Sequence, residues 1–285
     1  MDIKNLRIGP SGNDADFYNA GFKRGFESPS FVRSLGLNAF EYSFGRGFNA
    51  SLETCAVIGH HARMNDVLYS VHAPFYINFA NENDEMIEKS IQYVIKSIEY
   101  LYAFGGKKVV FHPASQGKLS RPDALEIARS NIKKLVDRIY SLGYDDVFIC
   151  PETMGKSMQI GSYFEKCDLC SIDKILVPCF DFGHINALSH GGLVTLSDFK
   201  NVFAYSKSVL GDEKTNNCHI HFSKIQYGDK GEIRHLDFDD TVFGPDFRLL
   251  AKAIKDCKIT PSIICESSTK MSADACVMKN ILENV

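Results

Sequence analysis

The chain has 285 residues, of which 45% are hydrophobic and 24% charged, a balance typical of globular proteins with a filled core. This excludes disordered, collagen-like and coiled-coil proteins. The formal net charge of -3 gives no overall positive field for a nucleic-acid partner. No apolar run reaches the roughly 20 residues of a membrane span, and Met1–Asn5 lacks the apolar stretch of a signal peptide. We therefore expect a cytoplasmic protein without membrane contact.

Short β-type runs alternate with longer amphipathic stretches, and this pattern occurs eight times. The predicted strands are Leu6–Gly9, Ala39–Ser43, Leu68–His72, Lys108–His112, Val147–Glu152, Ile175–Asp181, Asn217–Ser223 and Ser262–Glu266. The clearest predicted helices are Asp84–Phe104, Arg121–Leu142, Thr195–Leu210 and Pro245–Cys257. No linker or composition break interrupts the series, which favours a single α/β domain over residues 1–285, a (β/α)8 TIM barrel. An open Rossmann sheet is the alternative, but no G-x-G-x-x-G follows the first strand.

The carboxyl ends of the strands meet at one face of such a barrel, where active sites lie. Six successive predicted strands, the third to the eighth, end on a side chain of metal-ligand type, and two further histidines follow nearby. These residues are His72, His112, Glu152, Asp181, His221 and Glu266, followed by His184 and His235. Imidazole and carboxylate ligands suit zinc, manganese or iron, and eight groups could hold two or three ions if Glu152 bridges. The pattern predicts metal-assisted hydrolysis, as in phosphoryl transfer.

A single histidine or glutamate at a strand end is more often a packing group, so it is the convergence of six strands that indicates a site. The other histidines carry weaker signals. His60 and His61 fall in a predicted helix away from the strand ends, and nothing in the spacing requires His190 in the site. His219 shares the inward face of its strand with His221, so a hydrogen bond to a ligand and a barrel-filling role are equally open.

Nine cysteines are scattered along the chain, which favours reduced thiols over a disulfide framework. Cys167 and Cys170 form a C-x-x-C motif without a second pair, a weak signal for metal binding. Cys150 and Cys179 precede Glu152 and Asp181 by two residues, so we expect them to fill the barrel beneath the site.

Together these segments resemble the endonuclease IV family of apurinic/apyrimidinic endonucleases, among the xylose-isomerase-like barrels. The matching segments, in chain order, are His72–Asn78, Phe111–Pro113, Pro151–Thr153, Asp181–His184, His221–Lys224, Arg234–His235 and Glu266–Ser267. The resemblance implies a zinc enzyme, with two or three ions per chain, that cleaves the DNA backbone 5′ to an abasic nucleotide during base excision repair. It also implies three ligand sets: His72, His112 and Glu152; the bridging Glu152 with Asp181, His221 and Glu266; and His184 with His235.

The sequence departs from the family pattern at two places. The family has an aspartate ligand two residues before the histidine that matches His235, where this chain has Ile233. The third site is then completed by water, Glu232 or Asp237, or it is weak or empty. The segment Ile8–Ser11 also lacks the histidine that family members often carry after the first strand.

The resemblance implies that duplex DNA with abasic sites is the partner of a monomeric enzyme. Phe75 and Tyr76 fall on a segment that the family inserts into the duplex, although loop packing explains these aromatics equally well. Arg46 is a looser match to a second inserted loop. Lys156 and Lys224, near strand ends, could contact phosphates.

Two rival functions remain open at this stage. One is a sugar or sugar-phosphate isomerase or epimerase that uses Glu152 and Glu266 with one divalent metal to move a proton beside a carbonyl. These two glutamates are our predicted catalytic residues. The other is a noncatalytic binding barrel with a structural metal. It is disfavoured by the number of unpaired acids and imidazoles, which would be electrostatically costly to keep together without metal.

Overall fold

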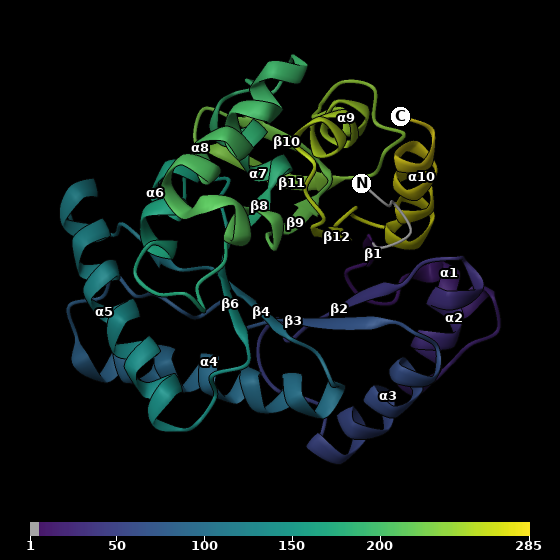
Figure 1. The fold of residues 1–285 in the computed structure, drawn as a ribbon, viewed down its shortest axis with the longest axis horizontal. Helices are drawn as coiled ribbons and strands as arrows, with labels where there is room; N and C mark the ends of the chain where they lie inside the picture. The colour runs from purple at the N-terminus through teal and green to yellow at the C-terminus, as the bar shows by residue number, and fades with distance from the viewer. Residues whose placement is uncertain (1–5) are drawn as a thin grey trace.

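The computed structural model describes residues 6–285, and its framework is a ring of eight parallel strands (Figure 1). The strands are β1 (Arg7–Pro10), β2 (Ala39–Ser43), β3 (Leu68–His72), β4 (Lys108–Phe111), β6 (Phe148–Pro151), β8 (Cys179–Asp181), β9 (His219–Phe222) and β12 (Ser262–Cys265). Two four-stranded sheets, in the orders β2-β3-β4-β6 and β1-β12-β9-β8, form the two halves. The predicted TIM barrel is confirmed. The extent of the single domain, which reaches into residues 1–5 outside the described part, stays a prediction.

A side chain closes the junction between β1 and β2. The Ile8 N–H donates to the Asn38 side-chain oxygen at 2.8 Å, and the Asn38 N–H donates to the Ile8 carbonyl at 3.0 Å. Gly9 permits this close approach, because a Cβ there would lie 1.6 Å from the carbonyl oxygen of Ala39.

Two isolated parallel bridges, Ile149–Leu176 and Glu152–Cys179, close the junction between β6 and β8. The predicted strand Ile175–Asp181 is regular only over its last three residues. Pro178 explains the difference, since proline has no N–H to donate to a ladder.

Helices cover the outside of the ring, with α3, α4 and α5 around the β2–β6 half and α8, α9 and α10 around the other half (Figure 1). In chain order they are α1 (Ala15–Asn19), the 3-10 helix η2 (Gly25–Glu27), α2 (Ser28–Ser34), α3 (Leu52–Met64), α4 (Asp84–Phe104), α5 (Arg121–Ser141), α6 (Tyr163–Cys170), α7 (Phe182–Leu188), α8 (Leu196–Asn216), α9 (Phe247–Cys257) and α10 (Met271–Asn284). The α4 bounds equal the predicted ones. The Asn83 side chain caps the first turn of α4, and Gly105 ends the helix at φ 76°.

Two predicted helices have different ends. The α8 helix continues past Leu210 to Asn216, with a break at Gly211, whose φ of 81° lies outside the helical region. The α9 helix begins at Phe247, because the Asp246 side chain accepts the Arg248 N–H and acts as the N-cap.

Two short antiparallel strand pairs lie at the carboxyl face of the ring. One joins β5 (Ala114–Ser115) to β7 (Gln159–Ile160), and the other is the hairpin of β10 (Lys224–Gly228) and β11 (Gly231–Leu236). No helix among the described residues is long and apolar enough to cross a membrane. The cytoplasmic location stays a prediction.

Alternate residues of the strands fill the inside of the ring. Val110, Cys150, Val177 and Cys179 form a small buried apolar cluster of their own. The two cysteines are thus fillers, as the alternation predicts. All nine cysteines are free thiols, and seven are buried.

Candidate metal centre

Six of the eight predicted ligands line one cavity of about 260 Å³ at the carboxyl face of the barrel, and the other two, Asp181 and His221, lie beside Glu152 and Glu266. His72 ends β3 and Asp181 ends β8, while His112, Glu152 and Glu266 each directly follow a strand. Parallel register explains the convergence, because Asp181 pairs with His221 and Glu152 bridges to the strand that ends at Asp181. The cavity is lined by His72, His112, Glu152, His184, His235 and Glu266, among others.

Glu152 lies at the centre of this cluster and is 1% exposed. Its Oε2 lies 3.0 Å from His72 Nε2 and 3.2 Å from His112 Nε2. Its Oε1 lies 3.2 Å from His184 Nδ1 and 3.3 Å from His221 Nδ1. Each carboxylate oxygen therefore faces a different pair of imidazoles, which is the arrangement of a bridging ligand.

The tautomer of His72 identifies its free nitrogen. Its Nδ1 lies 2.9 Å from the Ala73 carbonyl, which can only accept, so Nδ1 carries the proton. The lone pair on Nε2 then points at the Glu152 carboxylate. Two acceptors 3.0 Å apart require a shared proton or cation. Two ligands of a tetrahedral zinc ion lie about 3.4 Å apart, so the spacing suits an ion.

Asp181 offers an unpartnered oxygen to the second donor group. Its Oδ1 accepts the His184 N–H at 2.7 Å and caps α7, whereas its buried Oδ2 has no hydrogen-bond partner among residues 6–285. Asp181, Glu152, His221 and Glu266 each present a ligand atom within 4.8 Å of the others. A buried oxygen with no donor inside such a group fits a cation.

The pKa shifts within the second donor group also favour a bound cation. Burial, together with the nearby charges of Glu266 and Glu152, raises the pKa of Asp181 to about 6. Burial would also raise the pKa of Glu266, but His221 lowers it to about 2. For His221, burial opposes the charged form, but Cys179 and the surrounding carboxylates raise its pKa well above the ordinary value. The acids and imidazoles thus compete for protons that a metal ion would replace.

A third donor group consists of His184, Glu232 and His235. His184 Nδ1 lies 2.9 Å from the Thr153 carbonyl, and its Nε2 lies 3.3 Å from Glu232 Oε2. His235 Nε2 lies 4.0 Å from Glu232 Oε1. Both β11 residues therefore face His184, which lies on α7.

Glu232 takes the place of the third ligand beside His184 and His235, which the sequence alone could not assign. Ile233 is 56% exposed and points away from the group. Asp237 accepts from Thr269 and Lys270 instead. Of the substitutes considered from the sequence, Glu232 is the side chain that the fold brings to His184.

Four of the five predicted DNA-contacting residues lie at or near the mouth of the cavity. Phe75 and Lys156 line it, and Tyr76 lies beside Phe75 with a ring-centroid distance of 4.4 Å. The two rings are 48% and 50% exposed, so they do not serve loop packing alone. Arg46 is exposed and follows Gly45, which lines the cavity.

Lys224 is not among the residues brought to the cavity. Its ammonium donates to the Phe238 carbonyl at 2.8 Å and to the Asp240 carbonyl, so it fixes the chain after β11. His60 and His61 lie on α3 outside the ring, and His190 lies exposed in the loop after α7. Cys167 and Cys170 are buried in α6.

Sequence reasoning missed Glu41, a fully buried carboxylate in the middle of β2. Its Oε1 lies 2.9 Å from His221 Nε2, and its Oε2 lies 2.9 Å from His219 Nε2. Burial opposes its ionisation, but the charge of His221 and the hydrogen bond from His219 hold its pKa well below the ordinary value. The alternation along β2 is the signal that could have placed it on the inner face.

A family model described as the xylose isomerase-like TIM barrel matches residues 29–280. The chain belongs to this family. Its relatives include the uncharacterized protein MJ0133 of Methanocaldococcus jannaschii, which is 34% identical over 242 residues and covers 85% of this chain and 86% of the relative. A probable endonuclease 4 of Staphylococcus carnosus is 30% identical over 185 residues. That match covers 59% of this chain and 58% of the relative, less than two thirds of its length.

Solved structures with a similar fold are described with different activities. Endonuclease IV of Thermus thermophilus has a TM-score of 0.66 at 18% identity, covering 92% of this chain and 95% of that chain. A D-tagatose 3-epimerase-like protein has a TM-score of 0.69 at 18% identity, covering 90% of each chain. The predicted relationship to endonuclease IV is confirmed at the family level. Because epimerases share the fold, the reaction must be argued from the site.

Proposed function

We propose that this protein is a metal-dependent phosphodiesterase of the endonuclease IV type, which cleaves DNA on the 5′ side of an abasic nucleotide and acts as a monomer. The observation that carries the proposal is the convergence of three donor groups, two of which share Glu152, while the third takes two of its three residues from β11 and one from α7. A phosphodiester develops charge on several oxygens during cleavage, and neighbouring ions can stabilise all of them. Proton transfer beside a carbonyl develops charge mainly on one oxygen, so it gives no reason for a third donor group.

The residues that would hold the ions follow from the donor groups. The three sets are His72, His112 and Glu152; Glu152, Asp181, His221 and Glu266; and His184, Glu232 and His235. Nitrogen and oxygen donors without sulfur suit zinc, with manganese or iron as alternatives. Bound there, such ions would supply Lewis acidity that activates water and neutralises phosphate charge.

The remaining site residues position the substrate in this proposal. Glu152 and Glu266 are the proposed catalytic carboxylates, since both line the cavity in which the phosphate would lie. Lys156 reaches the same cavity and would pair with a flanking phosphate. The exposed rings of Phe75 and Tyr76 offer a surface on which an unpaired base could stack. Arg46 would contact the backbone from the loop after β2.

A sugar epimerase remains the second candidate, because two observations favour it. The cavity of about 260 Å³ is small, and the chain has a formal net charge of -3, both of which suit a small substrate. Glu152 and Glu266 would then exchange the substrate proton. Epimerase activity on ketohexoses with one ion per chain would support this candidate.

The direct test is cleavage of a duplex oligonucleotide that carries one tetrahydrofuran abasic analogue. Protein loaded with zinc or manganese should cut on the 5′ side of the analogue, and a chelator should abolish the cut. The same duplex without the analogue is the control. Metal analysis should find two or three ions per chain. Fully loaded protein that leaves the analogue intact would reject the endonuclease proposal.

A further inference from the structure

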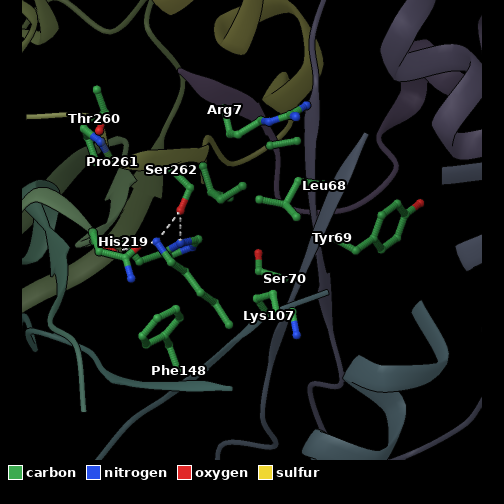
Figure 2. Close-up of a pocket in the computed structure, with 14 residues that line it drawn as sticks. Arg7, Leu68, Tyr69, Ser70, Lys107, Phe148, His219, Thr260, Pro261 and Ser262 are labelled. Carbon is green, nitrogen blue, oxygen red and sulfur yellow. Dashed lines mark hydrogen bonds between the residues drawn. The ribbon is translucent and has the colours of Figure 1, made fainter. Parts of the chain in front are cut away.

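A chain of buried polar side chains runs beneath the metal centre toward the opposite face of the barrel. Its members are Lys108, Ser262, His219 and Glu41, and each is less than 9% exposed. Three of them, Lys108, Ser262 and His219, line a second cavity of about 260 Å³ at the amino end of the strands. Figure 2 shows the Ser262 hydroxyl directed at His219 in that cavity, with the hydrogen bond dashed.

Two groups set the directions of the hydrogen bonds in this chain: the ammonium of Lys108, which only donates, and the carboxylate of Glu41, which only accepts. Lys108 donates to Ser262 Oγ at 2.9 Å and to the Asn217 and Cys218 carbonyls at 2.7 and 3.2 Å. Ser262 Oγ in turn lies 2.7 Å from His219 Nδ1.

The carboxylate of Glu41 sets the direction at His219. Glu41 Oε2 lies 2.9 Å from His219 Nε2 and can only accept, so Nε2 carries the proton, and in a neutral ring Nδ1 accepts from Ser262. Ser70 donates to the same oxygen at 2.8 Å. The other oxygen, Oε1, lies 2.9 Å from His221 Nε2 in an ion-pair contact, and neither atom makes a hydrogen bond to any other described residue. A carboxylate oxygen opposite a ring nitrogen requires the proton on that nitrogen.

The proton on His221 Nε2 determines which nitrogen of this ring can bind a metal ion. His221 Nδ1 also faces carboxylates, Glu152 at 3.3 Å and Glu266 at 3.4 Å, so without an ion it too carries a proton. A bound ion would replace that proton, while Glu41 keeps the proton on Nε2. We propose that Lys108, Ser262, His219 and Glu41 are positioning residues that fix His221 in the tautomer whose Nδ1 binds metal. This inference rests on the metal centre of the proposed function, but not on DNA as the substrate.

Glu41→Gln is the main test, since it keeps the shape of the side chain but replaces one acceptor oxygen with an amide donor. Loss of an oriented partner typically lowers metal affinity roughly 10- to 100-fold. Competition with a chromophoric chelator should show a fall of that size for zinc. Ser70→Ala is the matched control: it removes a donor to the same carboxylate without changing any ring proton, and its affinity should stay within about threefold of the wild type.

Two further measurements separate positioning from a purely structural role. In a His221→Ala background, Glu41→Gln should have no additional effect on zinc affinity, because the residue acts through that ring. Ring ¹⁵N spectra of the zinc-loaded protein should show His221 protonated on Nε2, a signal that Glu41→Gln should shift. Should Glu41→Gln fail to fold, Ser262→Ala tests the same chain, with an expected loss of about threefold or more in zinc affinity.

The outcomes are distinguishable. The inference would be overturned if Glu41→Gln kept the wild-type zinc affinity and the wild-type His221 signals. If Glu41→Gln does not fold, the same result in Ser262→Ala would overturn it. An equal effect of Glu41→Gln with and without His221 would also overturn it. Absence of zinc binding by the wild type would reject the metal centre itself. Zinc binding that depends on Glu41, without cleavage of abasic DNA, would reject only the proposed substrate.

Discussion

Glu232 Oε2 lies 3.3 Å from His184 Nε2, although the two residues belong to different elements, the hairpin strand β11 and the helix α7. This contact makes a third donor group out of a sequence that lacks the expected aspartate. It also leads to the first prediction.

Glu232→Ala should remove one metal ion per chain, because His184 and His235 alone offer too few ligands for a tight site. Ile233→Ala is the matched control, since Ile233 is 56% exposed and points away from the group. Mass spectrometric metal analysis of both variants should show one ion fewer only for Glu232→Ala. Equal metal content in the two variants would contradict a role for Glu232.

Glu152→Gln should lower cleavage of the abasic duplex by about 100-fold or more, since it disrupts two donor groups at once. The substitution keeps the shape of the side chain, so the far-ultraviolet circular dichroism should be unchanged. Gln159→Ala, at another position lining the cavity, serves as the comparison and should retain most activity. A Glu152→Gln variant as active as the wild type would remove the bridging role.

Phe75→Ala and Tyr76→Ala should each weaken binding to the abasic duplex by about 1–3 kcal/mol, the usual contribution of a stacked base. Fluorescence anisotropy of a labelled duplex measures the affinity. Phe164→Ala is the control, because Phe164 is equally exposed but lies on α6 and does not line the cavity. Unchanged DNA affinity in both mouth variants would favour the small-substrate alternative.

Lys166→Met should stabilise the protein, most strongly below pH 7. Lys166 is fully buried, and its ammonium donates only to the Ile160 carbonyl at 3.2 Å among the described residues. Burial lowers its pKa to about 7, against about 10.4 in an unfolded chain. The unfolded state thus binds more protons between these values, so this group makes stability rise with pH from about 7 to 10 and imposes its full cost below pH 7.

Denaturant unfolding at pH 6 and pH 10 measures this effect. The gain from Lys166→Met should be roughly 4 kcal/mol larger at pH 6 than at pH 10, because a pKa lowered by about three pH units corresponds to that free energy. Lys214→Met is a comparison, since its ammonium is half-buried and donates to the Cys170 and Asp173 carbonyls. A gain for Lys166→Met that does not depend on pH would show that the buried charge is not its cause.

The strand ends could be predicted because their geometry is repetitive. Once the eight β/α units are recognised, barrel closure alone brings His72, Glu152 and Asp181 together. Glu41 escaped this reasoning because it lies inside β2 rather than at its end, and its partner His219 is 178 positions away. The choice between Glu232 and Ile233 also could not be read from the sequence. A bulge between Gln226 and Tyr227 shifts the register of the hairpin and decides which residue faces inward.

The close packing of that hairpin against the barrel depends on two glycines. A Cβ at Gly155 would lie 2.7 Å from Glu232 Cβ and 2.8 Å from His184 Cδ2, and a Cβ at Gly231 would lie 2.1 Å from the Gly155 carbonyl oxygen. A hydrogen bond from the Glu232 N–H to the Gly155 carbonyl, at 2.8 Å, links the hairpin to the loop after β6. Two of the three residues of the third donor group thus lie on a hairpin outside the eight strands of the barrel, and the third, His184, lies on α7. A side chain as small as a methyl group at Gly155 or Gly231 would therefore displace the hairpin and separate Glu232 from His184.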